Sequence, residues 1–274
     1  MQQYARALTI AGSDSGGGAG IQADLKTFAA LGCYGMSAIT ALTAQNTVTV
    51  RAIHAVPPAF VAEQLDAVLE DIGVDAVKIG MLANADIIRI VAERLRAHGL
   101  SRVILDPVMV AKSGDKLLAE EAVAALRSEL IPRVELITPN LPEASLLTDA
   151  KAATQEAMAA IGKKLLNLGP RYVLVKGGHF GGTESPDILL TKDAAGHMKT
   201  QWFTATRSGS NNTHGTGCTL SSAIAAYRAR GLDMAPAIEQ SKNYLTEAIR
   251  AGADYQLGQG HGPVHHFHSL WQNM

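Results

Sequence analysis

The chain has 274 residues, of which 47% are hydrophobic and 18% charged, and its formal net charge is −1. A near-neutral charge without long basic runs argues against a general nucleic-acid or anionic-membrane surface, so we expect a small-molecule partner. Cys33 and Cys218 form no Cys-x-x-Cys pattern, which argues against a disulfide framework and a cysteine zinc site. The first six residues lack a signal-peptide pattern and the apolar stretch 36–44 is too short to span a bilayer, so we expect a cytoplasmic protein with no membrane role.

Short apolar runs alternate with longer helical patterns along the chain. Strands are expected at 7–12, 36–43, 76–80, 103–105, 136–138 and 172–175, and helices at 21–31, 59–69, 87–97, 119–130 and 154–168, with a further helix that ends at Gly231. The strand runs lack polar alternation, as burial on both faces requires. The sequence therefore predicts an α/β fold with a mostly parallel central sheet and helices on both faces. No linker divides the chain, so we expect one domain over residues 1–274.

Ligands of such open sheets bind beyond the carboxyl ends of the strands, so the residues after each strand are candidates for a site. The first strand is followed by residues 12–20, a glycine-rich loop that matches neither the Walker loop nor the dinucleotide fingerprint. We interpret it as a backbone-lined substrate floor; in the alternative, Asp14 and Ser15 cap local N–H groups of a flexible turn. Gln45 follows the second strand, and its amide matches an amino group beside a ring nitrogen, although such a residue is usually solvated.

Polar side chains also follow the later strands. Asp106 could hold magnesium or its water, or start an Asp-Pro turn. Asn140 and Glu143 could lie near magnesium and phosphate, or cap the helix that begins there. Lys176 could meet nucleotide phosphates or remain solvated, and Met81 could be a pocket wall or core packing. The segment 110–116 is a candidate to close over a bound ligand.

A glycine-framed turn at residues 214–217 leads into an Ala-rich helical pattern. Bare amides and the helix dipole favour an anion at such an N-terminus, so a transferred phosphoryl group would fit there. The alternative is an ordinary glycine-rich helix entry. The tail at 260–268 holds four histidines without an interleaved carboxylate or cysteine, and we do not expect a metal site there.

Taken together, these motifs resemble the hydroxymethylpyrimidine (phosphate) kinases of thiamin biosynthesis, in the ribokinase-like superfamily. The resemblance covers essentially the whole chain and rests on Gly-Ser-Asp-Ser-Gly-Gly-Gly-Ala-Gly-Ile-Gln-Ala-Asp, Gln45, Asp-Pro-Val-Met, Thr-Pro-Asn-Leu-Pro-Glu, Val-Lys-Gly-Gly-His, Thr-His-Gly-Thr-Gly-Cys and the tail Gly-Pro-Val-His-His-Phe-His. It implies an ATP-dependent kinase of 4-amino-5-hydroxymethyl-2-methylpyrimidine and then of its monophosphate. It also implies a homodimer.

The resemblance assigns roles to individual residues of this chain. For substrate binding it implies that Gln45 reads the aminopyrimidine edge, within a pocket lined by Gly12, Ala19, Met81, Val108 and Cys218. For ATP and Mg²⁺ it implies Asn140, Lys176 and Glu143 at the nucleotide, with Asp106 and Glu143 at the metal. For catalysis it implies an anion hole formed by the amides of Gly215, Thr216, Gly217 and Cys218.

Cys218 stands where the wider superfamily carries an aspartate that is taken as the catalytic base. A free thiol has a pKa of about 8.5, lowered at a helix N-terminus, so we expect some thiolate at neutral pH. A weak base suffices where proton removal is late, as in the loose transition state of phosphoryl transfer. The second phosphorylation uses an anionic phosphate oxygen as nucleophile and needs no base.

Three alternatives remain open at this point. A pyridoxal or pyridoxine kinase would also act on a ring-borne hydroxymethyl group, and Gln45 favours the pyrimidine over it. A non-catalytic sensor of a thiamin precursor would not need Asn140, Glu143, Asp106 and the anion hole. A nicotinamide dehydrogenase is disfavoured by the failed dinucleotide fingerprint.

Overall fold

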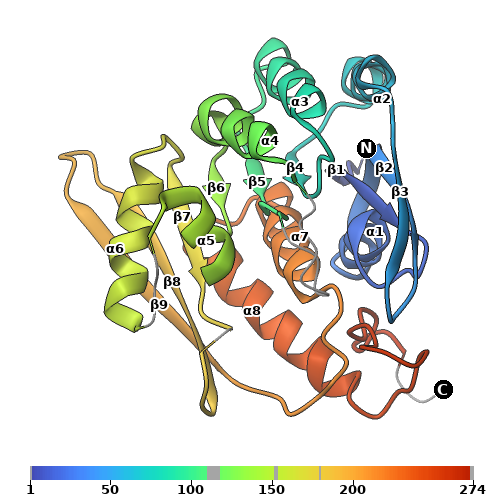
Figure 1. The fold of residues 1–274 in the computed structure, drawn as a ribbon, viewed down its shortest axis with the longest axis vertical. Coiled ribbons are helices and arrows are strands. Elements are labelled where there is room, and N and C mark those ends of the chain that lie inside the picture. The colour runs from blue at the N-terminus through green and yellow to red at the C-terminus, as the bar shows by residue number, and fades with distance from the viewer. Residues whose placement is uncertain (1, 110–117, 151–153, 179, 272–274) are drawn as a thin grey trace.

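The computed structural model describes residues 2–109, 118–150, 154–178 and 180–271, so the segment 110–116 expected to close over a ligand lies outside the described residues. Within that part of the chain, nine strands form one sheet in the order β3-β2-β1-β4-β5-β6-β7-β8-β9 (Figure 1). The strands are β1 (Ala5–Asp14), β2 (Cys33–Gln45), β3 (Val50–Ala55), β4 (Ala76–Ile79), β5 (Val103–Leu105), β6 (Leu136–Ile137), β7 (Tyr172–Lys176), β8 (Glu184–Lys192) and β9 (Met198–Thr206).

The six neighbouring strands β2, β1, β4, β5, β6 and β7 pair in parallel, which confirms the predicted parallel core. Antiparallel strands extend both edges: β3 pairs with β2, and β8 and β9 follow β7. These three strands were not predicted. Five of the six residues of β3 are exposed, so it lacks the apolar run that marks a buried strand.

Helices cover both faces of the sheet (Figure 1). They are α1 (Gly20–Ala30), α2 (Pro58–Asp71), α3 (Ala85–Ala97), α4 (Glu120–Ala125), α5 (Leu141–Thr148), α6 (Gln155–Leu166), α7 (Thr216–Ala229) and α8 (Met234–Ala251). One core contains buried side chains of α2 to α6, and the other contains those of α1, α7 and α8. Neighbouring residues of β1 serve both cores, since Leu8 belongs to the first and Ala7 to the second.

The predicted helix at 119–130 is only partly α-helical. After α4 the chain continues as a π-helical turn over Leu126–Leu130 and a short 3-10 turn over Ile131–Arg133. Pro132 lies in that last turn, and because proline has no N–H it cannot continue the regular hydrogen-bond ladder. Helix α8 was not predicted, and of α5 only the start at Asn140 was predicted. No helix in the described ranges is long and apolar enough to cross a membrane.

Candidate active site

A cavity of about 880 Å³ is lined by the loops that follow β1, β2, β4, β5, β6 and β7, and by the N-terminus of α7. Every site residue predicted from the sequence lines it: Gly12, Ala19, Gln45, Met81, Asp106, Val108, Asn140, Glu143, Lys176, Gly215, Thr216, Gly217 and Cys218. A second cavity of about 520 Å³, between residues 208–212 and 253–260, contains none of them. The structure therefore brings the predicted residues into one space.

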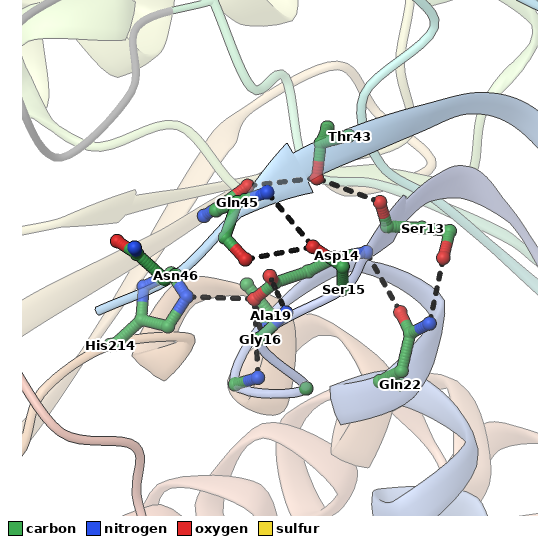
Figure 2. Close-up of polar contacts among 12 residues, drawn as sticks. Ser13, Asp14, Ser15, Gly16, Ala19, Gln22, Thr43, Gln45, Asn46 and His214 are labelled. Carbon is green, nitrogen blue, oxygen red and sulfur yellow. Dashed lines mark hydrogen bonds and ion pairs between the residues drawn. The ribbon is translucent and has the colours of Figure 1, made fainter. Parts of the chain in front are cut away.

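Asp14 organises the glycine-rich loop. Its carboxylate accepts hydrogen bonds from the N–H groups of Gly16 (2.8 Å), Gly18 (3.1 Å) and Ala19 (2.9 Å), so the capping interpretation is confirmed for Asp14 (Figure 2). It is wrong for Ser15, whose hydroxyl bonds the main chain of Gln45 instead. The Nε2 of His214 lies 2.8 Å from Asp14 Oδ2. Burial alone would raise the pKa of Asp14, but the hydrogen bonds from His214 and the loop amides outweigh burial and the pKa is lowered. The buried carboxylate therefore stays ionised and only accepts, which makes His214 the donor.

Glycine is required where the loop meets α7. Gly215 is the N-cap of α7 and has a φ of 79°, in the left-handed region that favours glycine. A Cβ at this position would also overlap the carbonyl oxygen of Gly18. At Gly12 a Cβ would lie 2.5 Å from Met81 Cε, so the Met81 side chain covers the backbone of β1. Because neither glycine has a side chain, the main chain of Gly12 and of Gly215 forms part of the cavity wall.

The N-terminus of α7 lies beside a buried ion pair. Lys176 Nζ is 2.8 Å from Asp106 Oδ1, and a Cβ at Gly217 would lie 3.4 Å from Lys176 Nζ and from Asp106 Oδ2. Burial alone would lower the pKa of Lys176, but the charges of Asp106 and Glu143 outweigh burial and raise it. Lys176 is therefore a positive charge beside the N-terminus of α7.

Asn140 and Glu143 form a capping box at the start of α5. The Asn140 side chain accepts the Glu143 N–H at 2.9 Å, and Glu143 Oε2 accepts the Asn140 N–H at 2.8 Å. The capping alternative is thus confirmed, although both residues also line the cavity. Burial raises the pKa of Glu143 to about 7, with Lys176 acting to lower it and Asp106 to raise it further.

Asp106 and Glu143 supply two carboxylates, which is enough for a magnesium ion that also binds phosphates and water but too few for a metal site made of protein ligands alone. Burial is the main cause of the raised pKa of Glu143, the Asp106 charge raises that pKa further, and a cation near both carboxylates would relieve part of this cost. No group of three or more His, Cys, Asp or Glu residues in the described part of the chain could hold a metal by itself. Mg²⁺ typically uses one or two carboxylates together with phosphates and water.

Cys218 does not have the acidic thiol that we expected from its place at a helix N-terminus. Burial raises its pKa to about 11; nearby Lys78 acts to lower the pKa, while Asp24 and Asp106 act to raise it. Loss of hydration and the two carboxylates therefore outweigh the effect of Lys78 on this pKa. The prediction of some thiolate at neutral pH is wrong for this structure.

Lys78 and Asp24 form a buried pair that sequence reasoning missed. Lys78 Nζ lies 2.9 and 2.8 Å from the two carboxylate oxygens of Asp24, and both side chains are fully buried. Asp24 also accepts the hydroxyls of Thr9 and Ser222, each at 2.6 Å. The available signal was a lysine within the strand run 76–80, because a buried lysine needs a partner.

The histidine-rich tail packs against the helices behind the site. His266 Nε2 lies 3.0 Å from Thr219 Oγ1 in α7, and Tyr244 of α8 donates its hydroxyl to the His266 carbonyl. Burial lowers the pKa of His266 to about 3, so its ring is neutral at pH 7. The main-chain N–H of His214 donates to the carbonyl oxygen of Gly262 at 3.0 Å. This hydrogen bond links the tail to the residue before Gly215, the N-cap of α7.

The fold and this cavity define a phosphotransferase of the ribokinase-like class. Residues 14–265 match the family described as phosphomethylpyrimidine kinase. The chain belongs to the phosphomethylpyrimidine kinase family.

Individual relatives agree with this assignment. The hydroxymethylpyrimidine/phosphomethylpyrimidine kinase of Escherichia coli is 53% identical over 266 residues, which cover 97% of this chain and 98% of that protein. A crystal structure of phosphomethylpyrimidine kinase from Clostridium difficile has 47% identity and a TM-score of 0.78, covering 89% of this chain and 99% of that one. An ADP complex of Bacillus subtilis pyridoxal kinase has 37% identity and a TM-score of 0.89, covering 98% of this chain and 100% of that one.

Proposed function

We propose that this kinase transfers phosphate from ATP to the hydroxymethyl group of 4-amino-5-hydroxymethyl-2-methylpyrimidine, and then to the resulting monophosphate, in thiamin biosynthesis. The observation that carries the proposal is the single cavity that holds the Gln45 amide together with the α7 N-terminus and Lys176. The first can pair with an aminopyrimidine edge, and the other two can bind a phosphoryl group. Acceptor and donor would thus meet in one space.

The part of the cavity that would bind the acceptor substrate has one polar side chain, Gln45, among small and apolar residues. Gln45 would face the amino group and its neighbouring ring nitrogen, because its amide carries both a donor and an acceptor. Gly12, Ala19, Met81 and Val108 would enclose the ring. Such a pocket would fix the ring plane and would turn the hydroxymethyl group toward α7.

The donor half would stabilise the migrating phosphoryl group by charge and by amide hydrogen bonds. The amides of residues 215–218 would form the anion hole, and the Lys176 ammonium would neutralise phosphate charge. Cys218 would line the hole as a neutral thiol at pH 7, since its pKa is raised to about 11. The hydroxyl proton would then leave late, to water or to an oxygen of the transferred phosphoryl group, as a loose transition state allows.

Asp106 and Glu143 are the residues that would hold Mg²⁺, and Asn140 would place Glu143 through the capping box. Magnesium would supply charge neutralisation at the ATP phosphates. The resemblance also supports a homodimer, a cytoplasmic location and one kinase domain over residues 1–274, which we include in the proposal.

The proposal is tested by incubating the purified protein with ATP, Mg²⁺ and the aminopyrimidine alcohol, and by following products with liquid chromatography and mass spectrometry. We expect the monophosphate first, the diphosphate next, and no ATP consumption after chelation of magnesium. Failure to phosphorylate either aminopyrimidine substrate while ATP and magnesium are saturating would overturn it.

A second candidate activity is the phosphorylation of pyridoxal. The observation that favours it is the TM-score of 0.89 with Bacillus subtilis pyridoxal kinase. Pyridoxal also has a ring-borne hydroxymethyl group, but it presents a phenolic oxygen where the aminopyrimidine presents an amino group. The ratio of kcat/KM for the two substrates decides between them, and a preference for pyridoxal would reverse our ranking.

A further inference from the structure

The glycine-rich loop and the N-terminus of α7 meet at two glycines. Gly215 is the N-cap of α7, and a Cβ there would overlap the carbonyl oxygen of Gly18. A Cβ at Gly18 would in turn overlap the ring of His214. Because neither position has room for a side chain, the loop and the start of α7 are in direct contact, and the His214 ring covers the main chain of Gly18.

A single carboxylate oxygen also joins the two segments. Asp14 Oδ2 lies 2.8 Å from His214 Nε2 and accepts the Ala19 N–H at 2.9 Å (Figure 2). Ala19 lines the part of the cavity that would bind the acceptor, and His214 directly precedes the amides of residues 215–218. The Asp14 side chain is only 3% exposed, so water hardly competes for it. One buried group thus connects the acceptor side of the cavity to the phosphoryl side.

Each segment is anchored separately on its own side. Lys26 of α1 donates to the Gly17 carbonyl oxygen at 2.8 Å, which holds the loop on α1. The main-chain N–H of His214 donates to the Gly262 carbonyl oxygen, which holds that residue on the C-terminal tail. The contact between the His214 ring and Asp14 therefore sets the position of one segment relative to the other.

We propose that His214 is a positioning residue for phosphoryl transfer: its ring holds the acceptor pocket at a fixed distance and angle from the N-terminus of α7. This inference rests on the proposed kinase function. The acceptor side carries the hydroxymethyl oxygen, and the amides of residues 215–218 carry the phosphoryl group, so the contact between the two segments aligns the reacting atoms. In this role His214 acts through Asp14 and touches no reacting atom.

Such alignment affects the transfer step more than binding. Each ligand would contact mainly its own side of the cavity, so a small shift between the two sides leaves the affinity for the aminopyrimidine nearly unchanged. The transfer step depends on both sides together, and a displacement of about 1 Å can cost about a hundredfold in rate. Loss of the His214 contact should therefore lower kcat and spare KM.

The test compares the wild-type protein with His214→Met, which removes the ring N–H, and with His214→Gln, which places an amide N–H at a similar reach. The matched control is His98→Met. His98 Nε2 lies 3.0 Å from Asp66 Oδ1 between α3 and α2, and neither is among the described residues that line the cavity.

For each protein we measure kcat, KM and the calorimetric Kd of the aminopyrimidine alcohol. Thermal unfolding is recorded in parallel. Hydrogen–deuterium exchange of residues 12–20, followed by mass spectrometry, reports how firmly the loop is held. Because exchange needs no turnover, a wild-type protein that failed to phosphorylate the aminopyrimidine would show the failure of the proposed function separately from the state of the contact.

We expect His214→Met to lower kcat about 10- to 100-fold, to leave KM and Kd within about threefold of wild type, and to speed exchange in the loop. His214→Gln should recover most of kcat and the slow exchange. His98→Met should keep kcat within about twofold even where it lowers the melting temperature.

Three kinetic results would overturn the inference: a wild-type kcat in His214→Met, a raised Kd in that variant with unchanged kcat, or a His214→Gln variant as slow as His214→Met. The second of these would show that the ring only shapes the pocket. Loop exchange that does not respond to His214→Met would overturn the inference as well.

Discussion

Gly217 is the position where a single change should most strongly oppose phosphoryl transfer. A Cβ there would lie 3.4 Å from Asp106 Oδ2 and from Lys176 Nζ, which is ordinary van der Waals contact, so Gly217→Ala should fold. Gly217→Asp adds a carboxylate within about 4 Å of the anion site. Two like unit charges at that distance repel by about 4 kcal/mol at an effective dielectric constant of 20. At about 1.4 kcal/mol per factor of ten, kcat/KM should fall about a thousandfold.

The assay measures kcat/KM for the aminopyrimidine alcohol with Gly217→Ala, Gly217→Asn and Gly217→Asp. Asparagine has the shape of aspartate without its charge, so the ratio between these two variants isolates electrostatics from bulk. We expect Gly217→Asp to be about 100- to 1,000-fold slower than Gly217→Asn, with a ratio that narrows as salt increases. Equal rates for the two variants would refute the assignment of an anion hole at this helix N-terminus.

Three further results are expected. Cys218→Ala should retain the second phosphorylation, because its nucleophile is already anionic; loss of that step in a folded variant would contradict this reasoning. The rate of Cys218 alkylation by iodoacetamide, measured by mass spectrometry, should keep rising with pH up to about 11, because the raised pKa leaves the thiol neutral below that value. A rate that stops rising below about pH 9 would contradict the raised pKa. Lys78→Met should lower the free energy of unfolding in urea by about 3–5 kcal/mol, because it leaves Asp24 buried and unpaired, and a loss under about 1 kcal/mol would exclude this role.

The parallel core was predictable because its strands are short apolar runs buried on both faces. Val103–Leu105 is an example, since all three residues are buried and the observed strand has the predicted bounds. Strand β8 contains a comparable buried run, Ile188–Leu190, which the sequence analysis missed, whereas the edge strand β9 carries no such signal. In β9 only Phe203 is buried, so the strand is specified by its pairing with β8 rather than by its own pattern.

The site was predictable one residue at a time, and its pairings were not. Candidates such as Asp106 and Lys176 were found by their place after a strand, and residues 215–218 by their place at a helix start. Their 2.8 Å contact joins residues 70 positions apart, and no local pattern records it. The thiol of Cys218 shows the same limit: its sequence position indicates a helix N-terminus, but its pKa depends on burial and on charges from other elements.

The contact between Asp14 and His214 joins residues that are 200 positions apart. At the usual pace of translation, about 5–20 residues per second, some 10–40 s pass between the synthesis of the two. During that interval the nascent chain carries the acceptor loop without the turn that clamps it. The complete site can therefore form only late in translation, after the segment that contains His214 has left the ribosome and packed against the loop that contains Asp14.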